Sequence, residues 1–181
     1  MKSRGLIISQ EMAMPSDSKS VLAVYDLGND FLNQKAEDGE LFFLQTRTRA
    51  SAATRIFTIA TGAKYFHVLV SISASLATIV NFYEGVTITV AGTKQVLRNY
   101  NRNYDDDNLL TVIHGGATFT GGTLISPNQA GFGSNPGQAV SGIVNEVIAY
   151  ILKPNTIYGY EVIPDASCDT LARSIAWEGI I

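Results

Sequence analysis

From Glu40 onward, apolar and polar residues alternate with a period of two, the pattern of β-strands with one buried face. These runs are rich in Val, Ile, Thr, Tyr and Phe. Turn residues separate them at intervals of about 8–12 residues. This rhythm predicts an all-β protein folded as a sandwich or a barrel. The predicted strands lie within Glu40–Arg49, Arg55–Thr61, Lys64–Ser73, Ala77–Gly85, Val86–Thr93, Leu109–Gly116, Ala117–Ser126, Glu146–Thr156, Thr156–Pro164 and Ala172–Gly179.

Two later segments are harder to assign. Residues 141–153 also carry apolar residues four positions apart, which would suit a helix. We favour a strand because the segment is short, with Gly142 near its start and Pro154 directly after it. The glycine- and proline-rich residues 126–142 are interpreted as one long loop.

The N-terminal part of the chain has the weakest pattern. A polar, turn-prone stretch, Met14–Ser20, lies between the apolar segments LIIS and VLAVYDL. We interpret residues 1–35 as an extended N-terminal arm that orders against a neighbour or against its own domain, with a frayed terminus as the alternative. Residues 36–181 are then the β-sandwich domain.

Composition narrows the function classes. The chain has 181 residues, of which 46% are hydrophobic and 16% charged, against an average near 25% charged. It therefore predicts one globular domain rather than a disordered chain. The net charge of −3 argues against nucleic-acid binding. No apolar run approaches the roughly 18 residues of a membrane-spanning helix, so no membrane partner is expected. The apolar patch near residue 5 is too short for a secretory signal, so we expect cytoplasmic synthesis.

Catalytic and metal-binding motifs are missing from the sequence. Cys168 is the single cysteine, and there is no zinc motif or nucleophile elbow. Residues 116–123 imitate the spacing of a phosphate-binding loop, but a glycine stands where the lysine is needed. His67 is expected to be hydrogen-bonded or outward-facing, and His114 lacks a nucleophile signature to accompany it. The aspartates at 105–107 suit a solvated turn better than a calcium loop. We therefore expect no enzyme activity, no catalytic residue, no metal and no cofactor.

Two features are candidates for an interface. Arg47 and Arg49 share one strand face and could pair with an acidic partner, although a solvated edge is the favoured alternative. Residues 99–108 interleave Tyr100 and Tyr104 with Arg102 and several asparagines. Aromatic planes beside amide donors suit sugar rings or a protein surface, but a plain exposed loop needs no ligand.

Five further residues are expected to serve the scaffold. Gly85 and Gly92 would supply the positive φ that hairpin turns need. Pro154 would fix the turn after the 146–152 segment, and Asn155 tolerates a left-handed conformation there. Trp177 is the only tryptophan, and we expect it to plug the core of the sandwich.

An ordered set of short motifs resembles a family of virion-associated structural proteins of tailed bacteriophages. In that family these motifs are an aromatic-Glu-Gly turn, a Gly-Thr, an Asn-Arg loop, a Leu-Lys-Pro-Asn-Thr-x-Tyr element and a terminal Trp-x-Glu-type strand. The similarity spans roughly residues 38–178. The matching residues are Tyr83-Glu84-Gly85, Gly92-Thr93, Asn99–Asn103, Leu152–Thr156 with Tyr158, and Trp177-Glu178, preceded by EDGELFF at Glu37–Phe43 and by Ser51–Arg55.

The resemblance implies an antiparallel β-sandwich of jelly-roll type, with about eight strands, in a capsid decoration (cement) protein. Its implied partners are the major capsid protein and other copies of itself, as a homotrimer. Its implied location is the capsid surface of a virion made in the host bacterial cytoplasm. Two alternatives stay open: a tail- or fibre-associated jelly roll that binds host glycan through Tyr100 and Tyr104, and a low-copy neck or collar connector.

Overall fold

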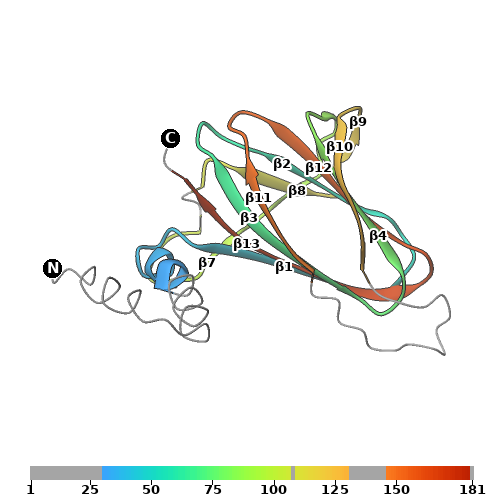
Figure 1. The fold of residues 1–181 in the computed structure, drawn as a ribbon, viewed down its shortest axis with the longest axis horizontal. Helices are drawn as coiled ribbons and strands as arrows, with labels where there is room; N and C mark the ends of the chain where they lie inside the picture. Colours follow the sequence, from blue (N-terminus) through green and yellow to red (C-terminus); the bar gives the residue numbers. More distant parts are fainter. Residues whose placement is uncertain (1–29, 107–108, 131–145, 180–181) are drawn as a thin grey trace, which may run out of the picture.

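The computed structural model describes residues 30–106, 109–130 and 146–179 (Figure 1). Residues 30–37 are helical, and strands make up most of the rest. The strands are β1 (Phe42–Ser51), β2 (Arg55–Ala60), β3 (Phe66–Ala74), β4 (Thr78–Glu84), β5 (Thr87–Val90), β6 (Thr93–Gln95), β7 (Arg98–Asn99), β8 (Val112–Gly115), β9 (Thr118–Thr120), β10 (Thr123–Ala130), β11 (Glu146–Leu152), β12 (Ile157–Pro164) and β13 (Cys168–Glu178).

Two antiparallel sheets pack against each other, which confirms the predicted all-β sandwich. The five-stranded sheet has the order β11-β3-β13-β1-β7, and the six-stranded sheet has the order β10-β4-β12-β2-β8-β6. Strands β1 to β4 alternate between the two sheets along the chain. Strands β10 to β13 alternate too, and they insert so that β13 lies between β1 and β3 while β12 lies between β2 and β4. A separate ribbon pairs β5 with β9.

The core lies between the sheets and follows the period of two. In β3, Phe66, Val68, Val70 and Ile72 are all buried, while the residues between them are half-buried on the other face. Aromatic side chains fill the centre from the opposite sheet. The Phe82 ring stacks on Tyr158 with 5.5 Å between centroids and meets Tyr160 edge-on at 5.9 Å.

The predicted strand over residues 146–152 is confirmed, because β11 pairs with β3 along its whole length. The predicted long loop at 126–142 is wrong for residues 126–130, which continue β10 and pair with β4. The remainder of that loop lies outside the described residues.

The prediction of an extended arm is wrong for the residues of it that the structure describes. Residues 30–35 belong to the 30–37 helix, so the expected boundary between arm and domain at residue 35 falls inside a helix. Gly39 follows the helix by two residues, and its φ of +72° turns the chain toward β1. Residues 1–29 of the expected arm lie outside the described residues.

The scaffold residues divide into two groups. Gly85 has φ +73° after β4, and Asn155 has φ 50° between β11 and β12, as their expected roles require. Gly92 does not have the expected positive φ. A Cβ there would lie 2.4 Å from the Gly115 carbonyl oxygen, so this glycine is needed for a close approach of two backbones.

Trp177 does not plug the core as expected. It lies on the opposite face of β13 from Ala176, which is fully buried between the sheets. The alternation of β13 therefore turns small side chains inward and the tryptophan outward.

Candidate interaction surface

The outer face of the five-stranded sheet carries rows of apolar side chains that cross several strands. In one row Ile151 of β11 lies opposite His67 of β3, which lies opposite Trp177 of β13. In the next row Leu69 lies opposite Ile175. The surface formed by these residues and by Phe31 of the helix is called the outer patch. Its members are Phe31, His67, Leu69, Ile151, Ile175 and Trp177.

Three rings contact one another in sequence at one end of the outer patch, with Trp177 between the other two. His67 lies parallel to Trp177, with 5.0 Å between centroids and 8° between planes. Phe31 meets the same tryptophan edge-on at 5.8 Å, and the Lys35 Nζ lies 5.9 Å from the Phe31 centroid. Burial, with a smaller effect from the Lys35 charge, lowers the pKa of His67, so the neutral imidazole is favoured in this stack.

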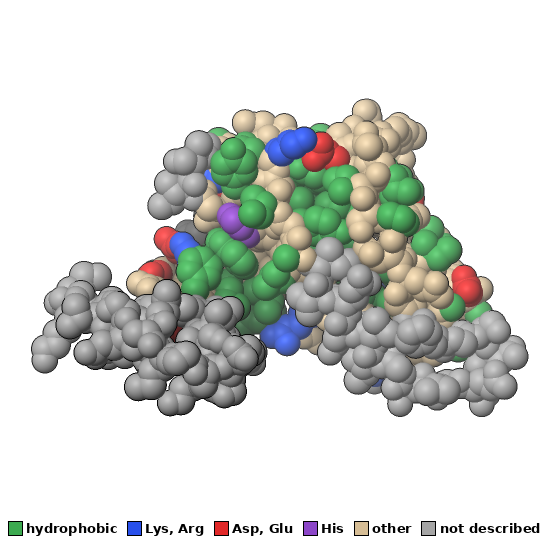
Figure 2. Space-filling view, viewed as in Figure 1, with side chains coloured by type: hydrophobic (Ala, Val, Ile, Leu, Met, Phe, Trp, Pro, Cys, Tyr) green, Lys and Arg blue, Asp and Glu red, His purple; other side chains and the backbone are tan. Residues whose placement is uncertain are grey.

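Two members of the outer patch are exposed in the described part of the chain, and the other four are half-buried. Ile151 is 68% exposed and Phe31 48% exposed. Figure 2 shows hydrophobic side chains gathered over the β11, β3 and β13 side of the sandwich. Exposed apolar side chains that neighbour one another on a sheet are a candidate surface for contact with another protein.

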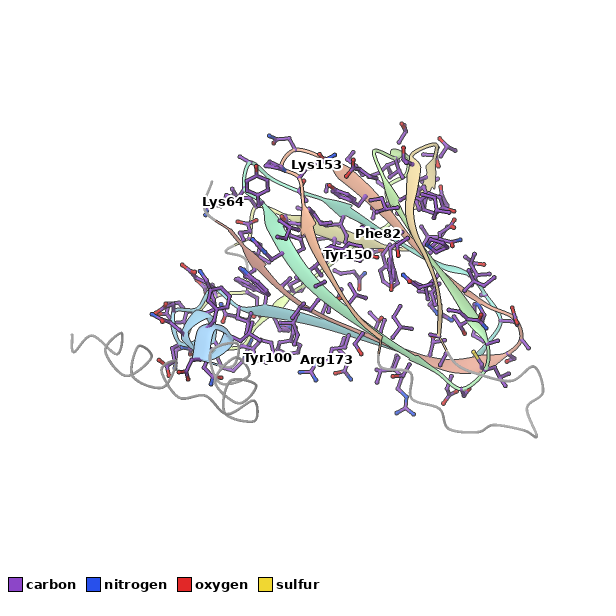
Figure 3. The ribbon with its side chains drawn as sticks, viewed as in Figure 1. Lys64, Phe82, Tyr100, Tyr150, Lys153 and Arg173 are labelled. Carbon is purple, nitrogen blue, oxygen red and sulfur yellow. The ribbon has the colours of Figure 1, made fainter. Side chains whose placement is uncertain are left out.

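The same outer face becomes polar further along the strands. Tyr100 packs edge-on against Phe43 at 5.0 Å between centroids, and its hydroxyl accepts a 2.7 Å hydrogen bond from Arg173 (Figure 3). Arg47 is exposed and lies 3.8 Å from Asp169 of the neighbouring strand. Arg47 therefore has an acidic partner in its own sheet. Arg49 lies in β1, but its side chain is outside the described residues.

The loop that carries Tyr100, Arg102 and Tyr104 is bonded to itself and to the end of the helix. Asn99 is fully buried, and its Nδ2 donates to the Gly39 carbonyl oxygen at 2.7 Å. Asn101 Nδ2 donates to the Glu37 carbonyl oxygen at 3.0 Å. These two bonds fasten the loop to the turn that joins the helix to β1.

Asp106 closes this loop from its other end. Its carboxylate accepts hydrogen bonds from the Asn99 backbone at 2.8 Å, from Arg98 at 2.6 Å and from Arg102 at 2.8 Å. These three donors, the backbone N–H first, lower the pKa of Asp106 to about 2. The guanidinium of Arg102 therefore neutralises a carboxylate of its own loop.

The expected sugar platform of Tyr100 and Tyr104 is not assembled as a pair. Tyr104 covers Gly39, where an added Cβ would lie 2.4 Å from the tyrosine Cγ, while Tyr100 packs on Phe43. The two rings thus serve separate contacts within the chain. Of the candidate interface residues whose side chains are described, Tyr100, Arg102 and Tyr104 lie in one loop, and Arg47 pairs with Asp169.

Two of the motifs that are far apart in sequence meet at one end of the sandwich. Lys153 Nζ donates to Glu84 at 2.6 Å, and the Tyr158 hydroxyl donates to the same carboxylate at 3.2 Å. The Lys153 backbone N–H donates to the Tyr158 hydroxyl at 2.9 Å. The bond from Lys153 is the main reason that the pKa of Glu84 is lowered. This arrangement fixes the turn at Pro154 and Asn155 and has no obvious chemical activity.

A small cavity of about 40 Å³ lies between the sheets. It offers room for about three water molecules at 10–15 Å³ each. The Tyr160 hydroxyl is buried without a hydrogen-bond partner, and burial raises the pKa of this group. Figure 3 shows Phe82 and Tyr150 in the same region between the sheets. The lining residues are Leu44, Thr46, Phe57, Ile59, Val70, Phe82, Ile113, Tyr160, Ala172 and Ser174.

Within residues 30–106, 109–130 and 146–179, no group of three or more His, Cys, Asp or Glu is placed to hold a metal ion. Cys168 is buried in this region, with its Sγ 3.8 Å from the Thr78 hydroxyl. The helix found in the described part of the chain is too short and too polar to cross a membrane.

No protein-family model matches the chain, and no curated protein matches it either.

Sequence reasoning missed the outer patch. The sequence pattern draws attention only to His67 and Trp177 among its members, and it predicts an interface role for neither. The available signal was that apolar residues occupy the outward positions of neighbouring strands, such as Leu69 and Ile151, where a solvated sheet face would carry polar ones.

Proposed function

We propose that this chain is a non-enzymatic virion structural protein, a bacteriophage capsid decoration (cement) protein. It binds the outside of the phage head and stabilises contacts between major capsid subunits. The outer patch is the observation that carries the proposal, because exposed apolar side chains grouped on one sheet face are a feature of protein contact surfaces. The motif set that resembles phage structural proteins supports the same reading.

The strand order supports the jelly-roll part of the proposal. Eight strands, β1 to β4 and β10 to β13, alternate between two sheets, and the returning strands β12 and β13 insert between the outgoing ones. That wrapping is what two Greek keys closed into a double sheet require. The β5–β9 ribbon and the short strands β6 to β8 are then additions between the two halves.

The physical advantage of such a protein lies in repetition. A subunit that binds the assembled shell but not free capsid subunits shifts the equilibrium toward the shell. Many identical weak contacts on one particle become strong through multivalency. We propose a cyclic homotrimer as the attached form, with the N-terminal arm reaching a neighbour.

The geometry gives the glycan-binding alternative no support. Tyr100 contacts Phe43 and Arg173 of the same chain. Tyr104 covers Gly39. A neck or collar connector would use a protein contact like the outer patch, so copy number distinguishes it from a cement protein.

The test is attachment to heads that lack this protein. Purified wild-type protein and the Ile151→Lys variant are mixed with such heads and sedimented. Because Ile151 is already largely in solvent, the lysine leaves the fold intact but places a charge in the outer patch. We expect occupancy of the heads to fall at least tenfold, since desolvating an unpaired charge opposes binding.

The matched control is Ile79→Lys. Ile79 is 43% exposed and lies in β4 of the other sheet, so its substitution adds the same charge away from the outer patch. We expect this variant to attach like the wild type. Equal occupancy for Ile151→Lys and wild type would remove the outer patch from the attachment surface, and no attachment by wild type would reject the cement function.

A further inference from the structure

The cavity between the sheets arises from a mismatch between two facing sets of side chains. On the six-stranded sheet, three aromatic rings lie side by side across β2, β12 and β4, namely Phe57, Tyr160 and Phe82. On the five-stranded sheet, the inward positions of β1 and β13 carry small side chains, namely Thr46, Ala172 and Ser174. Because the small side chains do not fill the space in front of the rings, a volume of about 40 Å³ remains.

This cavity is partly open to solvent. Thr46, Phe57 and Ser174 all point between the sheets, yet each of them is only half-buried. Solvent therefore reaches this part of the interior. A small molecule can enter from solution while the two sheets stay packed.

Tyr160 gives the cavity wall a polar group that lacks a partner. The residue is only 7% exposed, and its hydroxyl is buried with no hydrogen-bond partner in the described part of the chain. Burial raises the pKa of this hydroxyl, so it keeps its proton and remains a donor. A buried donor without an acceptor is unfavourable, and an occupant that brings an acceptor oxygen removes this penalty.

The volume and the lining limit what the occupant is. One water-sized group needs about 10–15 Å³, so the cavity takes roughly three or four non-hydrogen atoms. An engineered cavity that binds benzene measures about 150 Å³, so an aromatic ring is too large. No charged residue lines the cavity, and an unpaired ion would be costly to bury there.

We propose that this cavity binds a small uncharged carbonyl compound of about four non-hydrogen atoms. Its apolar carbons lie against the aromatic row of β2, β12 and β4, and its carbonyl oxygen accepts a hydrogen bond from the Tyr160 hydroxyl. The cavity is on the inner face of the five-stranded sheet, whereas the outer patch is on the opposite face. The proposal therefore stands apart from the proposed function.

The test is an NMR titration of the full-length protein with acetone, which has three carbons and one acceptor oxygen. We expect saturable shifts of the methyl signals of Ile59, Val70 and Ile113, which line the cavity, and none at Ile151 of the outer patch. Tyr160→Phe removes only the hydroxyl and should weaken binding about five- to tenfold. Shifts that do not saturate would overturn the site, and equal affinity in Tyr160→Phe would overturn the assigned ligand class.

A second variant closes the cavity. Ala172→Val adds two methyl groups from β13 and should abolish the saturable shifts. Ala149→Val is the matched control, because Ala149 is exposed in β11 and does not line the cavity. It should bind acetone like the wild type. Thermal unfolding shows whether each variant is folded. Saturable binding by folded Ala172→Val would overturn the proposal, and if that variant does not fold, Tyr160→Phe decides.

Discussion

At the scale of single residues, Asn99 connects segments that are distant in sequence. Its side-chain amide donates to the Gly39 carbonyl oxygen, and its Oδ1 accepts from the Asn101 backbone N–H at 2.9 Å. The Asn99 side chain is fully buried, so water cannot take its place as a hydrogen-bond partner when the side chain is removed. Through Asn99 the loop, the helix end and the start of β1 form one unit.

Replacing Asn99 with alanine should lower the free energy of unfolding by about 1–3 kcal/mol, because it leaves the Gly39 carbonyl oxygen without its donor. Asn103→Ala is the control in the same loop, since Asn103 is exposed. We expect it to change stability by less than about 0.5 kcal/mol. Urea unfolding of both variants measures the difference, and equal effects would show that the buried amide does not hold the loop.

Asp106 should give the loop an acid-sensitive contribution. Its pKa is lowered from 3.8 to about 2 in the folded protein, so the carboxylate stabilises the fold above about pH 4. That contribution is lost as the pH falls toward 2. An NMR titration of the Asp106 side-chain carboxyl should show a midpoint near 2, and Asp106→Asn should flatten the pH dependence of stability in this window. A midpoint near 4 would contradict the three-donor arrangement.

At the scale of elements, the alternation of residues was enough to place most strands but not to assign their faces. The pattern predicts β3, β4 and β12 in the right positions, because the side-chain period of a strand is two, but it places the start of β13 at Ala172 instead of Cys168. It could not show that Trp177 faces outward, since Trp177 and Ala176 are both apolar and the choice depends on the neighbouring strands. The helix at residues 30–37 has no apolar periodicity strong enough to predict it, and its position depends on tertiary contacts with Trp177 and Asn101.

The β5–β9 ribbon contacts the six-stranded sheet at Gly159, where the absence of a side chain leaves room for an aromatic ring. Phe119 of β9 lies over Gly159 of β12, where an added Cβ would be 2.5 Å from the ring, and it meets Tyr83 edge-on. Gly159→Ala should therefore displace the ring and cost about 1–3 kcal/mol.

A double-mutant cycle tests this contact. In the Phe119→Ala background the same glycine substitution should cost much less, because the ring that it displaces is already gone. Thermal unfolding of the four proteins gives the coupling. An equal cost of Gly159→Ala in both backgrounds would show that the two residues are not in contact.

At the scale of the whole molecule, composition and strand pattern predicted one all-β sandwich, and the structure agrees. The candidate surface could not be found the same way. The outer patch exists because Ile151, His67 and Trp177, which are far apart in sequence, come into register across three strands. The aromatic and amide residues of the Tyr100 loop suggest a binding platform in the sequence. The same residue types also suit contacts within the chain, so the sequence alone does not distinguish the two roles.

The central claim is that this chain is a cement protein present in many copies on a phage head. The most direct measurement is its copy number in purified particles, by quantitative mass spectrometry against the major capsid protein. We expect a number comparable to that of the capsid subunits, or a simple fraction of it. A number small enough for a single ring at the neck or tail would contradict the cement assignment.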